Sequence, residues 1–338
     1  MSIIDEDISS IIAKTELDYL KDKEILITGA SGLIGGYFAQ TLQKLKQTND
    51  GPSRIFLSSK SGEFQFHVDS ETEIITGDLS QANILERLPV LDVIVHAAGY
   101  AQPGKFLENP LLTLALNTTS TICLVRKIRA GGKFLFISSS EVYSGLNVTP
   151  FTEKQIGTTN TDHPRSPYIE GKRAGEAIVS ASKVHKNIDA KSVRLSLAYG
   201  PGTKLYDSRV MNSFIEQAIT TSRISLKDSG QAMRTYCYVA DAIELCFNVL
   251  GKGLDDIYNI AGNSRIKIRD LAKLISDITG ARLEIPENDL GGLAGAPDDV
   301  WLDISKAIAL SDKSEFITML SGVTNTIRWQ EENLFKRA

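Results

Sequence analysis

Short apolar runs alternate with helical patterns over most of the chain. The run Glu24–Thr28 predicts a buried strand, and apolar positions with a helical period follow it from Leu33 to about Lys46. A second helical period covers the first residues, from Ile3 to Leu20. Further buried strands are predicted at Arg54–Ser58, Glu73–Thr76, Val93–His96, Lys133–Ser138 and Ser192–Leu197. Longer helical patterns cover Pro110–Arg129 and Pro167–His185.

This alternation is typical of an α/β protein with a doubly wound parallel sheet and helices on both faces. After Tyr199-Gly-Pro-Gly the rhythm changes, and helices near 208–221, 239–250 and 269–279 are separated by short strands and loops. We therefore expect a smaller C-terminal α/β lobe. The segment Gly291–Pro297 predicts either a flexible loop near that lobe or a plain connector.

Composition narrows the classes of protein. The 338 residues are 42% hydrophobic and 23% charged with a net charge of −4, which excludes a disordered chain and argues against binding to nucleic acid. No apolar run is long enough to span a membrane. Three scattered cysteines and an acidic opening segment indicate a cytoplasmic protein. The four histidines lack metal-ligand spacing, so we expect no metal site.

Gly29, Gly32 and Gly35 form a GxxGxxG pattern between the first predicted strand and its helix. A tight turn, the approach of a diphosphate to backbone N–H groups and close packing of helix on strand each need a residue without a Cβ. The pattern in this context predicts a dinucleotide site.

The sequence leaves the choice of dinucleotide open. Ser58-Ser59-Lys60 follows the second strand, where hydroxyls and a cation could hold the 2′-phosphate of NADP or could form a solvated turn. Asp78 follows the third strand and could accept a hydrogen bond from the adenine amino group or shape a Gly-Asp turn. Both NAD and NADP are therefore kept as cofactors.

Tyr168 and Lys172 are four residues apart on a predicted helix, so they share one face. A phenol has a pKa of about 10, and a neighbouring ammonium makes its phenolate a competent base. Ser138-Ser139-Ser140 ends a predicted strand, at the edge of a parallel sheet where ligands bind. Ser139 could hydrogen-bond a substrate oxygen while Tyr168 takes its proton.

With these motifs in this order, the chain resembles an extended short-chain dehydrogenase/reductase of the nucleotide-sugar epimerase/dehydratase family. The segments 164–173 and 209–215 are very similar to its UDP-glucuronate decarboxylase branch. The segment 96–103 with Asn109-Pro110 and Asn117, and Arg234–Asp241, Tyr199-Gly-Pro-Gly and Asp303-Ile-Ser-Lys306, also match the family. The helical period near the start predicts an N-terminal helical extension at 1–22. The resemblance, which begins at about Lys23, implies a Rossmann-type dinucleotide domain at 23–198 and a nucleotide-sugar lobe at 199–338, with exchange of strands between the lobes left open. It also implies a homodimer packed through two helices of each subunit.

The motifs and the resemblance together assign the site. Tyr168 would take the sugar C4 hydroxyl proton, Lys172 would lower the pKa of Tyr168 and hold the nicotinamide ribose, and Ser139 would orient the oxygen. Glu141 and Ser140 complete the expected catalytic set. The expected dinucleotide residues are Gly29, Ser31, Gly32, Leu33, Ile34, Gly35, Ser58, Ser59, Lys60, Asp78, Leu79, Ala97, Ala98, Gly99, Asn117, Tyr168 and Lys172. The expected substrate residues are Pro103, Ser139, Ser140, Arg165, Tyr168, Arg209 and Arg234, of which Arg234 and Arg209 would pair with the nucleotide diphosphate.

The sequence leaves four candidate functions open. A 4-epimerase, which oxidises C4 transiently and returns hydride to the other face, is the leading interpretation. Ser140-Glu141 matches the decarboxylase branch and lacks the Asp-Glu pair of 4,6-dehydratases, but Phe106 replaces a substrate-contacting tyrosine of that branch and Leu197 replaces an asparagine. An NADPH-dependent 4-keto-sugar reductase is a third alternative, and a non-catalytic dinucleotide sensor is a fourth.

Overall fold

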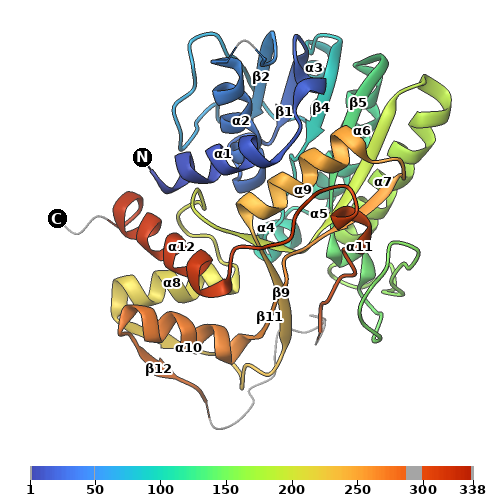
Figure 1. Cartoon of the computed structure of the whole chain (residues 1–338). Helices are drawn as coiled ribbons and strands as arrows, with labels where there is room; N and C mark the ends of the chain where they lie inside the picture. Colours follow the sequence, from blue (N-terminus) through green and yellow to red (C-terminus); the bar gives the residue numbers. More distant parts are fainter. Residues whose placement is uncertain (1, 49, 287–298, 336–338) are drawn as a thin grey trace.

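Seven parallel strands form the central sheet of this computed structural model, which describes residues 2–48, 50–286 and 299–335 (Figure 1). The strand order is β10-β6-β5-β4-β1-β2-β3, and every neighbouring pair is parallel. This order confirms the predicted doubly wound α/β fold. The strands of this sheet are β1 (Glu24–Thr28), β2 (Arg54–Ser59), β3 (Glu73–Thr76), β4 (Leu91–His96), β5 (Ile128–Ser139), β6 (Asp189–Leu195) and β10 (Ile257–Ile260).

Helices cover both faces of this sheet because successive strand residues point to opposite sides. On β1, Ile25 and Ile27 join a core beneath α1, α2 and α9, whereas Leu26 joins a second core beneath α5, α6 and α7. Apolar side chains on alternate residues of β2, β4 and β5 divide in the same way. The helices around the sheet are α1 (Ile3–Lys14), α2 (Leu33–Lys46), α3 (Ala82–Glu86), α4 (Pro103–Glu108), α5 (Pro110–Asn117), α6 (Thr119–Arg126), α7 (Ser166–Lys186) and α9 (Val239–Lys252), with 3₁₀ turns at Asp18–Leu20 and Ser140–Tyr143.

A smaller lobe lies beyond the carboxyl edge of the central sheet (Figure 1). It contains a three-stranded sheet in the order β11-β9-β7 and a two-stranded sheet of β12 and β8. Helices α8 and α12 both contact α10. The apolar face of α10 is buried through Leu271, Ala272 and Ile275. The elements of this lobe are β7 (Leu197–Tyr199), α8 (Val210–Thr221), β8 (Arg223–Ser225), β9 (Met233–Tyr238), β11 (Ser264–Lys267), α10 (Ile268–Thr279), β12 (Arg282–Glu284) and α12 (Met319–Asn333). The short helix α11 (Ser305–Ile308) lies against β10 and α9 of the central sheet.

The two lobes are interleaved in sequence. β6 lies in the central sheet and β7 lies in the small sheet, with only Ser196 between them. After β9, the chain returns through α9 to β10, which pairs with β6. Twelve of the fourteen residues of α9 are buried, so this helix from the C-terminal half belongs to the core of the central sheet.

Two of the predicted elements are divided in the structure. The helix expected over Pro110–Arg129 is divided at Thr118, where α5 ends and α6 begins, and its last residues become the start of β5. Polar side chains next to this break bond to the backbone, and Thr118 Oγ1 donates to the carbonyl oxygen of Leu114 at 2.8 Å. The strand expected over Ser192–Leu197 splits at Ser196, because its two parts pair with different sheets. The segment Gly291–Pro297 lies outside the described residues.

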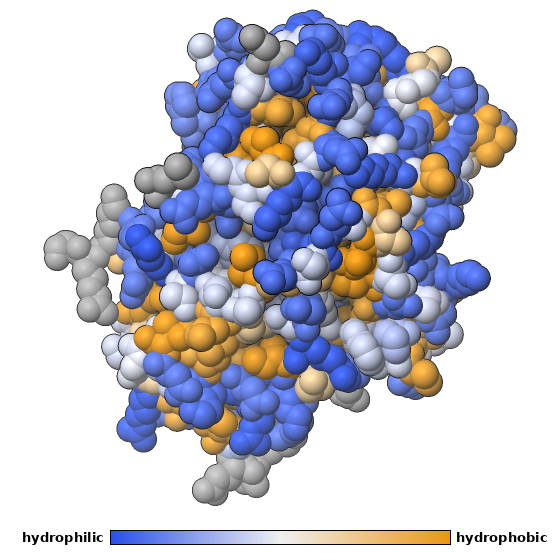
Figure 2. All heavy atoms as spheres, viewed as in Figure 1, coloured by the Kyte–Doolittle hydropathy of each residue, from blue (hydrophilic) through white to orange (hydrophobic). Residues whose placement is uncertain are grey.

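Figure 2 shows charged and polar residues over most of the visible face, with apolar residues in separate patches. In the described part of the chain, no helix combines the length and apolar character needed to cross a membrane.

Candidate active site

The predicted glycine-rich turn joins β1 to α2. Gly29 has a φ of +66°, and a Cβ at this position would lie 2.6 Å from the carbonyl oxygen of Ala97. A Cβ on Gly35 would lie 2.4 Å from the Gly29 carbonyl oxygen. Glycine is therefore required for the turn at Gly29 to approach both the loop after β4 and the first turn of α2. The helix begins after Gly32 with no side-chain cap, so its first N–H groups remain available to an anion.

The residues after β2 and β3 lie beside one another. Ser58 and Ser59 are buried, and the Ser59 hydroxyl accepts a hydrogen bond from the Gly62 N–H at 2.8 Å. Lys60 and Asp78, which the sequence offered to different parts of the dinucleotide, form an ion pair with each other at 3.2 Å. The ammonium of Lys60 therefore already has a carboxylate partner.

The loop after β4 meets α5 and α7. A Cβ on Gly99 would lie 3.7 Å from Lys172 Nζ and 4.0 Å from Asn117 Oδ1. Asn117 is buried, and its Nδ2 donates to the Thr113 carbonyl oxygen while its Oδ1 has no hydrogen-bond partner. Gly99 thus lies near Asn117 and Lys172, whereas Ala97 and Ala98 lie against Gly29 of the glycine-rich turn. Leu79 is buried nearby, where its carbonyl oxygen accepts from Ser120.

Tyr168 and Lys172 face the carboxyl end of β5 from α7. Tyr168 is 5% exposed, and burial raises the pKa of its phenol to about 12, opposed by a hydrogen bond with Ser139. Burial lowers the pKa of Lys172 to about 7, and its Nζ donates to the Ile137 carbonyl oxygen at 2.7 Å. The Lys172 ammonium lies 5.8 Å from the centre of the Tyr168 ring. The structure thus brings Tyr168, Lys172 and Ser139 together.

Glu141 and Arg165, expected to act separately on catalysis and substrate, form a salt bridge with each other. Arg165 Nε donates to Glu141 Oε2 at 3.2 Å, and a second guanidinium nitrogen donates to Oε1. The pairing arises because the 3₁₀ turn after β5 and the start of α7 are adjacent. It leaves neither the guanidinium nor the carboxylate free in this conformation.

Phe106 extends this arrangement to the tyrosine. Its ring is stacked on Tyr168, with centroids 4.6 Å apart and planes 10° apart, and the Arg165 guanidinium lies 5.3 Å from its centroid. Phe106 is buried, so α4 is anchored over Tyr168. From the sequence, Phe106 was noted only as a phenylalanine in place of a tyrosine. The apolar spacing of α4 does not indicate that Phe106 stacks on Tyr168.

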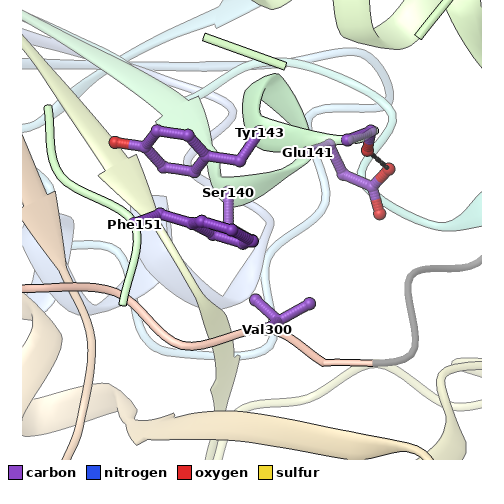
Figure 3. Close-up of a pocket in the computed structure, with 6 residues that line it drawn as sticks. Ser140, Glu141, Tyr143, Phe151 and Val300 are labelled. Atoms are coloured by element: carbon purple, nitrogen blue, oxygen red, sulfur yellow. Dashed lines mark hydrogen bonds between the residues drawn. The ribbon is translucent and has the colours of Figure 1, made fainter. Parts of the chain in front are cut away.

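A pocket adjoins the second half of the serine-rich turn. It is lined by Ser140, Glu141, Tyr143, Ser144, Phe151 and Val300 (Figure 3). Tyr143 and Phe151 stack with centroids 5.1 Å apart and form one wall. The Ser144 hydroxyl donates to Glu141 Oε2 at 3.4 Å on the other side.

The remaining expected substrate residues lie in different settings. Pro103 is the first residue of α4. Arg209 makes a salt bridge with the buried Asp207 at 2.6 Å. Arg234 lies on β9, and its Nη1 donates to the Met233 carbonyl oxygen at 2.7 Å. The positive charges of Arg165 and Arg209 oppose the rise in the pKa of Tyr168 that burial causes.

A doubly wound sheet, a glycine-rich turn and a buried Tyr-Lys-Ser group at the carboxyl edge define the class of dinucleotide-dependent enzymes that act on alcohol and carbonyl groups. Within that class, the chain belongs to the NAD dependent epimerase/dehydratase family, whose sequence profile matches residues 25–261. The predicted family is confirmed.

Individual relatives carry several activities. The chain is 28% identical to UDP-glucuronic acid decarboxylase 1 of Xenopus tropicalis, over 94% of this chain and 74% of that protein. It is 28% identical to UDP-glucuronic acid decarboxylase 6 of Arabidopsis thaliana, over 86% of this chain and 83% of that protein. Among solved structures, UDP-glucose 4-epimerase of Thermotoga maritima with UDP-glucose has a TM-score of 0.77 at 21% identity, covering 92% of this chain and 99% of that one. A dTDP-glucose 4,6-dehydratase of Streptomyces venezuelae with NAD bound also has a TM-score of 0.77, at 20% identity, covering 92% and 97%.

NAD is the cofactor of this family, and the residues present fit it. Gly29 and Gly35 leave the room that a diphosphate needs at the start of α2. Two buried polar atoms without a hydrogen-bond partner, Ser58 Oγ and Asn117 Oδ1, lie at the ends of the elements that border the same edge of the sheet. In the described part of the chain, no three His, Cys, Asp or Glu side chains form a group that could hold a metal ion.

Proposed function

We propose that the protein is a nucleotide-sugar 4-epimerase that oxidises the C4 carbon of the sugar transiently. The observation that carries this proposal is the contact group of Tyr168, Lys172 and Ser139, beside Gly99 of the loop after β4 and Asn117 at the end of α5. Bound NAD would supply a reversible hydride acceptor. A hydride that returns to the opposite face of the 4-keto sugar inverts C4, with no net change in cofactor.

The protein's own groups handle the proton. The phenolate oxygen of Tyr168 accepts the C4 hydroxyl proton as the C4 hydride leaves, and later gives it back. Ser139 donates a hydrogen bond to the C4 oxygen and holds it within reach of the phenol. The Lys172 ammonium stabilises the phenolate and, through its other N–H bonds, orients the nicotinamide ribose.

We also propose a homodimer that works in the cytoplasm. Leu111 on α5, Ile122 on α6 and Val184 on α7 are exposed apolar side chains, and α7 contacts α5 and α6. A second copy covering these helices would bury them. All three cysteines are free, which suits a reducing compartment.

Decarboxylation of a UDP-glucuronate-like substrate is the second candidate. The curated relatives at 28% identity and the Ser140-Glu141 pair favour it. Against it, Arg165 and Arg209 are each engaged by a carboxylate of this chain, so neither is free for the carboxylate of a uronic acid. Phe106 also places an apolar ring where that branch has a substrate-contacting tyrosine. The reductase gains little support, because Lys60 is paired with Asp78.

One substrate separates the two candidates. With UDP-glucuronic acid and catalytic NAD, an epimerase gives the C4 epimer with the carboxylate retained, whereas a decarboxylase releases CO2 and a UDP-pentose. Parallel reactions with UDP-glucose test an epimerase that takes only neutral sugars. Anion-exchange chromatography with mass spectrometry measures each product. Formation of CO2 and a UDP-pentose with no C4 epimer would replace the epimerase proposal with its alternative.

The Tyr168→Phe variant tests the catalytic group. We expect turnover to fall about 10³-fold, because the variant lacks the proton acceptor, while the affinity for NAD stays within a few-fold. Lys273→Ala is the control, since Lys273 is an exposed residue of α10 that pairs with Asp277 and its change should leave turnover unaltered. Unchanged turnover in Tyr168→Phe would rule out the proposed chemistry.

A further inference from the structure

A buried carboxylate follows Lys172 one turn later on α7. Glu176 is four residues after Lys172, so the two side chains share one face of the helix. Glu176 is 5% exposed and Lys172 is 6% exposed. The proton transfer proposed above uses Lys172 and leaves Glu176 without a role, although a buried carboxylate is costly unless it is paired and hydrogen-bonded.

Ser138 and Arg194 hold the Glu176 carboxylate. Ser138 Oγ donates to Oε1, and Arg194 donates to Oε1 from Nε at 3.0 Å and to Oε2 from Nη2 at 2.7 Å. Arg194 is buried, and its Nη1 donates to the hydroxyl of Tyr143, which lines the pocket in Figure 3, at 2.9 Å. The same nitrogen donates to two backbone carbonyl oxygens of the segment 153–155. The guanidinium is therefore fixed on both sides, and the carboxylate with it.

Lys172 and Glu176 both bond to the carboxyl end of β5. The Lys172 ammonium donates to the Ile137 carbonyl oxygen at 2.7 Å, and Glu176 accepts from Ser138, the next residue of the strand. Gly175 allows α7 to come this close, since a Cβ there would lie 2.4 Å from an aromatic ring of β5. Adjacent residues of one strand thus fix the ammonium and the carboxylate.

Glu176 supplies the negative charge that favours the charged form of Lys172. Burial lowers the pKa of the Lys172 ammonium to about 7, and the charge of Glu176 opposes that fall. The other titratable groups that the structure places around Lys172 supply no negative charge. Burial lowers the pKa of His96 on β4 to about 3, so the imidazole is neutral, and Tyr168 is neutral below a pKa of about 12. Arg194 on β6 is a cation held against Glu176.

The remaining charges on the elements that pack against α7 lie elsewhere. Glu141 and Arg165 form a salt bridge beside Tyr168 and act on the pKa of its phenol in opposite directions. The helix α5, over Pro110–Asn117, carries no charged residue. The helix α6 carries one, Arg126, whose carbonyl oxygen lies at the far end of α7.

We propose that Glu176 is a positioning residue that keeps the Lys172 ammonium charged and in place. Ser138 and Arg194 hold the carboxylate for this task. An uncharged Lys172 could not stabilise the Tyr168 phenolate, so the carboxylate sets the upper limit of pH at which the pair works. The inference rests on the proposed function for the role of Lys172, and it holds for any reaction in which Tyr168 takes a proton.

Two substitutions separate charge from shape at position 176. Glu176→Gln keeps the length of the side chain and removes its charge, whereas Glu176→Asp keeps the charge and is one methylene shorter. We expect the pKa of Lys172 to fall by about one pH unit in Glu176→Gln and to stay close to wild type in Glu176→Asp. NMR titration of protein labelled with ¹³C at lysine Cε measures this, and Lys172→Arg identifies the signal because it lacks it.

The pH profile of turnover gives a second readout. For Glu176→Gln at pH 7.5, kcat/KM should fall about eightfold, because the charged fraction of an amine falls by that factor when its pKa moves from about 7 to about 6. Glu176→Asp should restore the profile. Glu332→Gln is the matched control, since Glu332 on α12 is exposed and pairs with Arg328, so that the same charge is removed far from α7.

A double variant separates the role of the carboxylate from its role in folding. Glu176→Gln leaves the buried Arg194 without a counter-charge, which destabilises the protein. Glu176→Gln combined with Arg194→Met removes both charges and should melt at a higher temperature than the single variant. Its Lys172 pKa should still lie below that of wild type, because the carboxylate is missing. A purely structural role predicts that stability and pKa recover together.

Each result decides the proposal. A lower Lys172 pKa in Glu176→Gln with a value near wild type in Glu176→Asp supports it, even if no C4 epimer is formed and the epimerase proposal fails. An unchanged Lys172 pKa in folded Glu176→Gln, or in the double variant, would overturn it. An equal fall in both single variants would overturn it as well, because fit and not charge would then be decisive.

Discussion

Burial shifts the pKa values of Tyr168 and Lys172 in opposite directions. Each group is more stable uncharged in the protein interior, so burial raises the pKa of Tyr168 to about 12 and lowers that of Lys172 to about 7. The working ion pair of phenolate and ammonium is therefore unfavourable until other charges support it. A positively charged nicotinamide ring would favour the phenolate in this way.

Lys172→Met should change how stability depends on pH. The pKa of Lys172 is about 7 in the folded protein and about 10.4 when unfolded, so between these values only the unfolded chain holds the proton. Stability from this residue therefore rises with pH above 7, by about 1 kcal/mol per pH unit, and the methionine variant lacks this rise. Urea unfolding of both proteins at pH 7 and pH 8.5 measures the difference. Parallel pH profiles would show that the amine is not buried as described.

The N-terminal helix α1 contributes a buried carboxylate, Asp7, that accepts hydrogen bonds from two other elements. Asp7 Oδ2 accepts hydrogen bonds from Tyr37 on α2 at 2.8 Å and from Tyr238 at the end of β9 at 2.9 Å. The helix therefore connects the cofactor-binding helix to the small lobe. Its apolar positions Ile8 and Ile11 are buried in the same contact.

Asp7→Asn should stabilise the protein at neutral pH. Burial raises the pKa of Asp7 to about 6, above its unfolded value of about 3.9, so its contribution to stability falls as pH rises from 4 to 6. An asparagine oxygen accepts the same two hydrogen bonds without charge. We expect the variant to gain about 2 kcal/mol relative to wild type between pH 4.5 and pH 7.5.

Denaturant unfolding at these two pH values measures that gain. Asp7→Ala is the control, because it leaves two buried tyrosine hydroxyls without their acceptor and should destabilise at both pH values. A constant difference between Asp7→Asn and wild type across this range would contradict the raised pKa.

Elements built from local signals were predictable, and contacts between distant segments were not. Glu24–Thr28 and Leu33–Lys46 have the bounds that the sequence indicates, because strand, glycine turn and helix pattern are all local. The break at Ser196 depends on which sheet each half joins, which no local pattern encodes. The residues that contact Glu141, Phe106 and Ser31 likewise come from other elements. The sequence therefore pointed to these residues but could not predict what they contact.

The interleaved chain predicts that the whole molecule folds as one unit. β6 needs β10 as its neighbour, and the core beneath α9 includes side chains of β1, β2 and β4. Division at residue 198 would leave an exposed strand edge and an uncovered apolar face.

A fragment of residues 1–198 should therefore fail to fold. We expect it to aggregate or to lack a cooperative melting transition, whereas the full chain should unfold in a single transition. A fragment of residues 1–262, which retains α9 and β10, is the matched comparison and should recover more ordered structure. Circular dichroism and gel filtration measure both properties. A soluble, cooperatively melting 1–198 fragment would show that the central sheet is autonomous.

The interleaved connections give the molecule a narrow waist. The backbone passes between the two sheets at Ser196, again between Tyr238 and Val239, and again between Ile260 and Ser264. It passes back again between α11, which packs on β10, and α12, which contacts α10. A rotation of one lobe against the other must pivot on these neighbouring passages. Residues beside the pivot would barely move, while α10 and β12 at the far end would travel farthest. Substitutions that stiffen or loosen this waist would therefore alter how the two lobes move when the protein binds and releases its ligands.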